Sequence, residues 1–252
     1  MRGQRRPLRH TREEVGMAYE IANLRKAYGE SQVLGGIDLS FQEGSITVVL
    51  GPSGCGKTSL LNILAGLDED YSGSVTGFGS GKVSYVFQED RLLPWMSAAD
   101  NVAFVLRDRM ERARARTVAE EALASVGLSE STYMKPGLLS GGMRRRVALA
   151  RAFAYPSDAI LLDEPFSSLD LKTRIAVMDL FMDLRTRDGR SAVVVTHDVR
   201  EAIYLGDRIA TLSDKPARIR DVFDLSLDRG QRAFASEDAA GFEARLYASI
   251  LA

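Results

Sequence analysis

The stretch Gly51-Pro-Ser-Gly-Cys-Gly-Lys57-Thr58 decides the fold of this 252-residue chain. It follows an apolar run over residues 45–50, typical of a buried strand, and precedes residues 58–65, whose leucines have the spacing of a packed helix. A glycine-rich loop between a strand and a helix can fold so that its backbone N–H groups point at phosphate oxygens. We therefore expect a phosphate-binding loop, with Lys57 neutralising phosphate charge and Thr58 holding Mg²⁺. The expected contact residues are Gly51, Pro52, Ser53, Gly54, Cys55, Gly56, Lys57, Thr58 and Ser59.

Two acidic residues end another apolar run. Residues 159–165 read Ala-Ile-Leu-Leu-Asp-Glu-Pro, which places Asp163 and Glu164 at the carboxyl end of a buried parallel strand. Ligands of open α/β sheets bind at that end. We expect Asp163 to belong to the Mg²⁺ shell and Glu164 to orient or deprotonate the attacking water. Acids at a strand end can also cap a helix, but their pairing with the phosphate loop favours the catalytic interpretation.

Composition and charge narrow the function classes. The chain has 33 lysines and arginines against 34 acidic residues, so its net charge of −1 offers no general attraction for nucleic acid. Its single cysteine and two histidines are too few ligands for a structural zinc site. No apolar run approaches the roughly 18 residues that span a bilayer. Residues 1–16 are rich in arginine and poor in apolar residues, so we expect a basic flexible tail there.

Strand patterns alternate with helical patterns along the rest of the chain, which predicts a parallel sheet. The strand patterns lie at residues 82–87, 159–162, 192–196 and 209–212. Between the first two, residues 89–155 have helical spacing, with Val118, Ala122, Leu123 and Val126 on one face. We expect this segment to be a helical insertion.

A further motif, Leu139-Ser-Gly-Gly-Met143, precedes an arginine-rich helical pattern. A hydroxyl and two glycines at a helix start can bind an anion or simply cap the helix. With this motif the chain resembles an ATP-binding-cassette ATPase subunit, and residues 139–143 resemble the signature motif of that family. Family members usually have Gln where this chain has Met143. The resemblance implies that Ser140, Gly141 and Gly142 contact the nucleotide.

The resemblance extends over about residues 17–220 and implies further roles. Tyr28 resembles the aromatic residue that stacks on adenine, and Gln88 resembles the glutamine that contacts Mg²⁺ and senses the state of transport. Asp170 lies in a segment that resembles the dimer-contacting loop of the nucleotide site, and His197 resembles the histidine near the γ-phosphate. Tyr28 as a core aromatic, Gln88 as a surface amide and His197 as a structural histidine are the alternatives.

The family implies an α/β fold: a P-loop NTPase core with a mixed, mainly parallel sheet, an antiparallel β subdomain and an inserted helical subdomain. On this basis we expect the core and β subdomain to span residues 17–88 and 156–215. The helical subdomain then spans residues 89–155, and residues 216–252 form a short C-terminal tail.

Residues 88–95, Gln-Glu-Asp-Arg-Leu-Leu-Pro-Trp, resemble the nitrate, sulfonate and taurine importer branch. This resemblance implies an ATP-hydrolysing motor subunit that uses ATP and Mg²⁺ at the cytoplasmic face of the inner membrane. Implied partners are a second copy of the chain, bound head to tail, separate transmembrane permease subunits and, indirectly, an extracytoplasmic solute-binding protein. Trp95 is expected either to face a permease helix or to pack within the helical subdomain.

Other functions are open at this point. A soluble cassette ATPase acting on a macromolecular partner is the main alternative, and a scaffold that binds nucleotide without hydrolysis is another. Glu164 and His197 disfavour the scaffold, and the absence of an Asn-Lys-x-Asp segment disfavours a GTPase. No nucleic-acid partner is expected, because acidic neighbours offset the arginines at 107–116 and 144–146.

Overall fold

The computed structural model describes residues 19–79, 81–232 and 236–251, so the expected tail over residues 1–16 lies outside the described part. Its central sheet has six strands in the order β5-β6-β7-β3-β8-β9. They are β5 (Val83–Val86), β6 (Ala159–Asp163), β7 (Ser191–Thr196), β3 (Ile46–Leu50), β8 (Arg208–Leu212) and β9 (Ile219–Asp224). The first five run parallel, and β9 pairs antiparallel with β8. Every residue of β3, β6 and β7 is buried, which explains their continuous apolar sequences.

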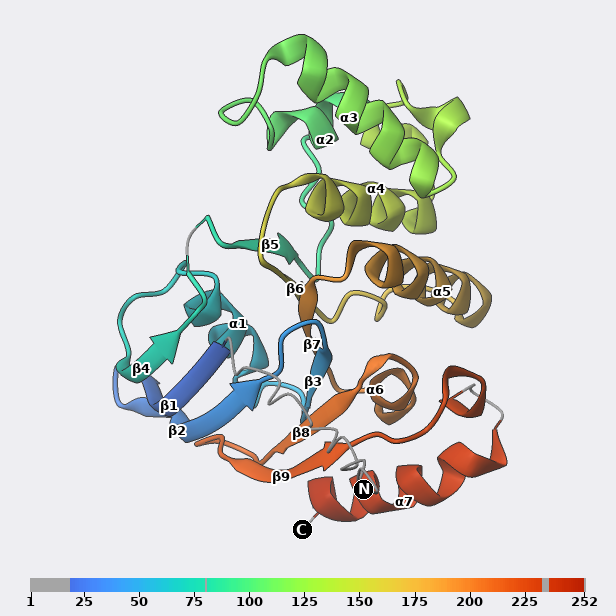
Figure 1. Cartoon of the computed structure of the whole chain (residues 1–252). Coiled ribbons are helices and arrows are strands. Elements are labelled where there is room, and N and C mark those ends of the chain that lie inside the picture. The colour runs from blue at the N-terminus through green and yellow to red at the C-terminus, as the bar shows by residue number, and fades with distance from the viewer. Residues whose placement is uncertain (1–18, 80, 233–235, 252) are drawn as a thin grey trace, which may run out of the picture.

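A second, antiparallel sheet lies beside the first (Figure 1). It has the strand order β2-β1-β4, formed by β2 (Ser31–Phe41), β1 (Tyr19–Tyr28) and β4 (Ser72–Thr76). Helix α1 (Lys57–Leu64) joins the two sheets, because Leu60 and Leu64 share one buried cluster with Leu24 of β1 and Val193 of β7. The expected mixed sheet and antiparallel subdomain are confirmed.

Three helices form the top of the molecule in Figure 1: α2 (Ala98–Phe104), α3 (Arg112–Ser125) and α4 (Gly141–Ala154). Short 3₁₀ turns at Ser129–Ser131 and Pro136–Leu138 connect α3 to α4. The buried residues of α3 are Ala115, Ala119 and Leu123, whereas Val118 and Ala122 are half-buried. The buried face is thus rotated slightly from the one expected. Helix α4 faces the core, where Phe153 packs near Phe181 of α5 (Leu171–Asp188).

The C-terminal segment is more integrated than a short tail. Beyond α6 (Val199–Leu205), residues 216–252 contribute β9, a 3₁₀ turn at Arg229–Arg232 and helix α7 (Glu237–Leu251). Strand β9 pairs the edge of β8, which would otherwise expose its N–H and C=O groups. Leu246 of α7 is fully buried in the cluster that lies against α6. Within the described residues, no helix has the length and apolarity needed to cross a membrane.

Candidate active site

The sheet topology brings three loops to one edge. Strand β7 lies between β3 and β6, so the carboxyl ends of these parallel strands are neighbours. The phosphate loop follows β3, Glu164 follows β6 and His197 follows β7. Both flanking loops are tied to the end of β7: Gly51 N–H donates to the Thr196 carbonyl at 3.3 Å, and Glu164 N–H donates to the Val195 carbonyl at 2.9 Å. Three sequence motifs far apart in the chain therefore meet.

The backbone conformation of the phosphate loop requires glycine at two positions. Gly54 and Gly56 have φ values of 77° and 119°, in the left-handed region that favours glycine. A Cβ atom at Gly56 would also come within 2.7 Å of Val33 Cγ1. Helix α1 begins at Lys57 without a side-chain cap, so its first N–H groups stay available to an anion.

Lys57, Glu164 and His197 form a compact cluster. The Lys57 amine donates to the carbonyls of Gly51 and Pro52, both at 2.9 Å, and lies 3.5 Å from Glu164 Oε1. The other oxygen of Glu164, Oε2, lies 3.1 Å from His197 Nδ1. The carboxylate thus bridges a buried lysine and a half-exposed histidine at the mouth of the phosphate loop.

Asp163 and Thr58 bring two oxygen-bearing side chains together beside this cluster. The Thr58 hydroxyl donates to Asp163 Oδ1 at 3.3 Å, and the Tyr85 hydroxyl lies 3.3 Å from Asp163 Oδ2. Burial raises the pKa of the Asp163 carboxyl, partly offset by these two hydrogen bonds. Hydroxyl and carboxylate oxygens are the ligands that Mg²⁺ prefers, so the pair fits this ion.

A pocket of about 220 Å³ opens beside the loop. Its lining includes Tyr28, Val33, Lys57, Glu164 and Lys215. Tyr28 is 51% exposed, which argues against a core role, and its hydroxyl lies 3.1 Å from an Asp68 oxygen and 3.3 Å from Ser59 Oγ. The hydroxyl is therefore held at the pocket, and Lys26 Nζ lies over the ring at 4.7 Å from its centroid.

The other expected nucleotide contacts lie away from this pocket. Ser140 caps α4 by accepting a hydrogen bond from Met143 N–H at 3.2 Å, and neither it nor Gly141 or Gly142 lines the pocket among the described residues. Asp170 is exposed and caps α5 through Thr173 N–H at 3.1 Å. These residues do not complete the site within one chain.

Gln88 also stands apart. Its residue is exposed, and its carbonyl accepts a hydrogen bond from Arg145 Nη2 at 2.5 Å. No contact between described residues joins the Gln88 amide to Thr58 or Asp163. The role of Gln88 as a metal contact therefore stays a prediction.

Tyr85, Val33 and Lys215 were not expected from the sequence as site residues. Tyr85 lies on β5, and its contact with Asp163 follows from the parallel pairing of β5 with β6. Its place in a predicted strand just before Gln88 is the signal that could have identified it. Val33 and Lys215 reach the pocket from β2 and from the turn after β8, and no local motif marks either residue.

The phosphate loop follows β3 of a parallel sheet, and an acidic pair lies at the end of β6, two strands away. This arrangement defines a P-loop nucleotide hydrolase. A family model described as "ABC transporter" matches residues 34–167, and the chain belongs to this family. It is accordingly an ATPase that uses ATP with Mg²⁺.

Curated relatives and solved structures agree with this assignment. An aliphatic sulfonates import ATP-binding protein of Burkholderia cenocepacia is 44% identical over 227 residues, covering 86% of this chain and 83% of that protein. A protein with the same description from Pseudomonas syringae is 46% identical over 194 residues, covering 77% and 80%. A dimeric ATP-binding cassette in a post-hydrolysis state with ADP and Pi superposes with a TM-score of 0.72 at 32% identity. The match covers 83% of this chain and 100% of that chain.

Proposed function

We propose that this chain is the motor subunit of a bacterial importer for aliphatic sulfonates, acting at the cytoplasmic face of the inner membrane. The cluster of Lys57, Glu164 and His197 at the phosphate loop is the observation that carries the ATPase part. The solute class rests on the printed descriptions of relatives that are 42–46% identical. These relatives favour transport over a soluble cassette acting on a macromolecule.

Glu164 is the proposed general base. Its carboxylate is next to the pocket, and its oxygens are oriented by Lys57 on one side and His197 on the other. A base held in this way can align and deprotonate water for attack on the terminal phosphate, an effect worth roughly 10²–10⁴-fold in rate. His197 is proposed to contact the γ-phosphate, and Lys57 to neutralise phosphate charge as the attack proceeds.

Thr58 and Asp163 are the proposed Mg²⁺ ligands, and the bound ion would neutralise phosphate charge. Tyr85 keeps Asp163 in place from the neighbouring strand. Gln88 is the proposed third contact to the ion and a sensor of transport. Within one chain Gln88 stands apart from these ligands, and Arg145 ties its backbone to α4, so the contact is proposed to form when two copies close on ATP.

Two copies are proposed to complete each site. Ser140, Gly141 and Asp170 are exposed and lie outside the pocket that holds Lys57, so another copy can supply them. Two of the similar solved structures are described as dimeric cassettes. In a head-to-tail dimer, ATP bridges both chains, so ATP favours closure and hydrolysis removes that preference.

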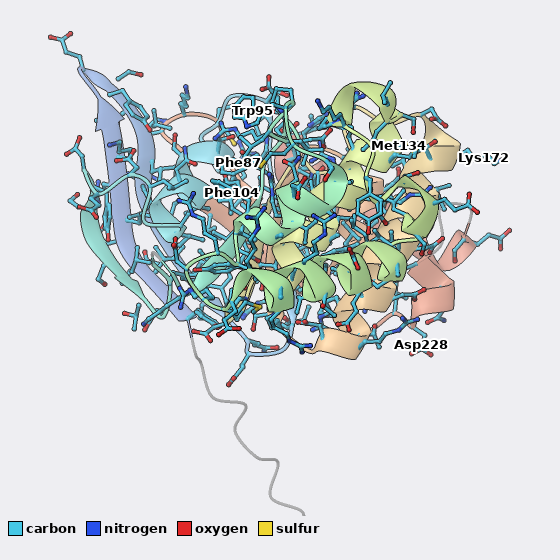
Figure 2. The ribbon with its side chains drawn as sticks, turned by 90° about the horizontal axis from the view of Figure 1, so that it is seen from above. Phe87, Trp95, Phe104, Met134, Lys172 and Asp228 are labelled. Carbon is cyan, nitrogen blue, oxygen red and sulfur yellow. The ribbon has the colours of Figure 1, made fainter. Side chains whose placement is uncertain are left out.

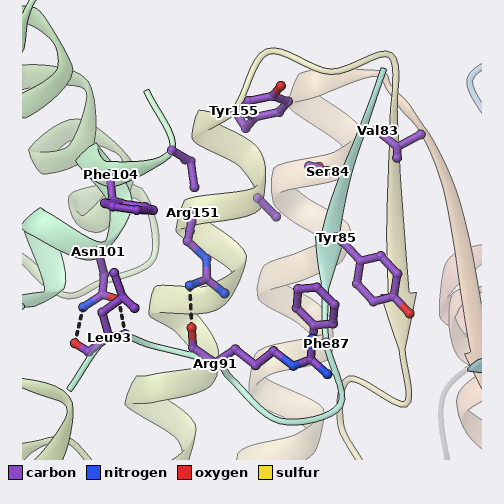
Figure 3. Close-up of a pocket in the computed structure, with 12 residues that line it drawn as sticks. Val83, Ser84, Tyr85, Phe87, Arg91, Leu93, Asn101, Phe104, Arg151 and Tyr155 are labelled. Carbon is purple, nitrogen blue, oxygen red and sulfur yellow. Dashed lines mark hydrogen bonds between the residues drawn. The ribbon is translucent and has the colours of Figure 1, made fainter. Parts of the chain in front are cut away.

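The permease subunits are proposed to bind beside Trp95, and an extracytoplasmic solute-binding protein is their proposed partner. A mainly apolar pocket of about 350 Å³ lies between β5 and α2, lined by Phe87, Arg91 and Phe104, with Arg91 over the Phe87 ring at 4.0 Å (Figure 3). Trp95 is 67% exposed, and Figure 2 shows it on the same side of the molecule as Phe87 and Phe104. Trp95 itself lines a second pocket of about 440 Å³ together with Met96 and Phe104, and exposed aromatic residues of this kind are common anchors for a partner.

Uptake of labelled ethanesulfonate by cells tests the proposal. Deletion of the gene should abolish uptake, and growth with ethanesulfonate as sole sulfur source should stop while growth on sulfate continues. Wild type and the exposed control Lys82→Ala should restore uptake, whereas Glu164→Gln should not. Uptake that survives deletion, or is restored by Glu164→Gln, would contradict the proposal, and loss of nitrate uptake alone would reassign the solute.

A further inference from the structure

Arg174, in the first turn of α5, connects the loop before that helix to the start of α6. Its Nη2 donates to the Leu169 carbonyl at 3.2 Å. Its Nη1 donates to Asp198 Oδ2 at 3.2 Å and lies 3.6 Å from Glu201 Oε1. One guanidinium therefore contacts three acceptors on two separate segments, which its planar fork of donors allows.

The two residues that flank His197 belong to this network. The Thr196 hydroxyl accepts from Asp198 N–H at 3.0 Å and donates to Glu201 Oε2 at 2.8 Å. Asp198 Oδ1 in turn accepts from the N–H groups of Arg200 and Glu201 and caps α6. The backbone on both sides of His197 is thus fixed, and the His197 ring lies 3.1 Å from Glu164.

The loop at residues 167–170 is hydrogen-bonded to the backbone of Glu164. The Ser167 hydroxyl and N–H both donate to the Glu164 carbonyl, at 3.1 Å and 3.3 Å. Leu169 N–H donates to Phe166, and Asp170 then begins α5. A shift of this loop would therefore move the Leu169 carbonyl, which Arg174 contacts.

Arg174 lies outside the nucleotide pocket, but its partner Asp198 directly follows His197. It is not among the residues that line the 220 Å³ pocket, and its side chain is mostly buried. Glu201 is almost fully buried, and its Oε1 has no hydrogen-bond partner among the described residues. Arg174 is therefore the cation that compensates this carboxylate.

We propose that Arg174 is a positioning residue for hydrolysis: it links the loop at residues 167–170, on the surface proposed to meet the second copy, to the placement of His197 beside Glu164. This inference rests on the proposed function. Closure of the dimer would move the loop, and Arg174 transmits the movement to His197 through Asp198.

The position of His197 beside Glu164 can be measured directly, because the chain has few histidines. His10 and His197 are the two histidines, so ¹³C-labelled histidine gives two ring signals, which His10→Gln assigns. Arg174→Gln should shift or broaden the His197 signal and leave that of His10 unchanged. Arg185→Gln is the matched control: it lies on the same helix with similar burial, but bonds Gly44 and Asp207 at the other end of the sheet. An unmoved His197 signal, or an equal shift in the control, would overturn the proposal.

Steady-state kinetics provides the second readout. Arg174→Gln should lower kcat about tenfold and change the KM for ATP less than about twofold, because a positioning residue acts on the transition state more than on ground-state binding. Arg174→Lys keeps the positive charge but loses the planar set of guanidinium donors, so its kcat should lie between those of wild type and Arg174→Gln. If Arg174→Gln does not fold, Arg174→Lys takes its place in both measurements. An unchanged kcat, or a rise in KM alone, would refute the role. A wild type without ATPase activity would instead contradict the proposed function, and the histidine signals would still decide the placement.

Discussion

Glu164 has an unfavourable backbone conformation, and its carboxylate contacts both Lys57 and His197. Its φ of 40° lies in the left-handed region, which costs a non-glycine residue on the order of 1–3 kcal/mol. Three contacts hold this conformation: the Glu164 N–H to Val195, and the carboxylate to Lys57 and His197. Such strain persists where the surrounding structure determines the geometry, and here it directs the carboxylate to the phosphate loop.

Cys55 is expected to be an unreactive thiol. Burial raises the pKa of the thiol, and the side chain is buried at the base of the phosphate loop. Because the thiolate is the nucleophile, a raised pKa lowers the reactive fraction at any pH below it. Alkylation by iodoacetamide at pH 8 should be slower than for an unperturbed cysteine, and below the raised pKa it should speed up roughly tenfold per pH unit.

Mass spectrometry of timed samples measures this rate, and the same protein in urea is the control. Unfolding should restore the rate of a free cysteine. A native rate equal to the unfolded rate would show that Cys55 is accessible and ionises normally.

At the residue scale, the sequence predicts the groups that belong to local motifs. Lys57 is marked by the glycine-rich loop after an apolar strand. Asp163, Glu164 and His197 are marked by apolar strands that end in polar residues, and parallel pairing brings all four together. Arg174 could not be predicted in the same way, because its partners on α6 become neighbours only through tertiary packing. Gln88 differs for a related reason: its backbone carbonyl accepts a hydrogen bond from Arg145 of α4, a contact between distant parts of the sequence.

At the scale of elements, α4 fastens the loop at residues 87–91 to the helical subdomain. Arg145 donates to the carbonyls of Phe87 and Gln88, at 2.7 Å and 2.5 Å, and its Nε lies 3.2 Å from Asp90 Oδ1. One turn and a half later, Arg151 donates to the carbonyls of Asp90 and Arg91, both at 2.9 Å. Arg145 and Arg151 therefore hold this loop against α4, so the arginine-rich face of the helix is only partly solvated.

Replacement of Arg145 should be costly. Arg145→Met removes the donors to two carbonyls and leaves Asp90 in a half-buried site with weaker compensation. Breaking a buried ion pair in this way costs about 3–5 kcal/mol in the free energy of unfolding. Urea unfolding followed by circular dichroism measures the loss. Arg146→Met, on the same helix and half-buried, should change stability by less than about 0.5 kcal/mol. A loss below about 1 kcal/mol for Arg145→Met would contradict this account.

The boundaries of elements follow from the sequence where hydrophobic periodicity is strong. The strands at β3, β6, β7 and β8 were predicted within a residue or two, because buried parallel strands are nearly all apolar. Strand β9, with the sequence Ile-Arg-Asp-Val-Phe-Asp, has no such pattern and pairs at the edge of the sheet. Its place depends on the exposed edge of β8, which no local signal reveals.

At the scale of the whole molecule, the two glycines that begin α4 lie outside the nucleotide pocket of their own chain. Gly142 is buried where α4 approaches α5: a Cβ atom there would come within 2.6 Å of Thr173 Cγ2. Ser140 and Gly141 remain exposed. A single copy therefore presents a half-site, and the central claim is that two copies share each ATP.

The most direct test is the steady-state ATPase rate per molecule measured against protein concentration. This rate should rise with concentration, because the proposed active species is a dimer. Glu164→Gln, which should bind ATP and hydrolyse it roughly 10²–10⁴-fold more slowly, should elute as a dimer with ATP and as a monomer without it. A constant rate per molecule from a persistent monomer would contradict the claim, because one chain would then complete its own site.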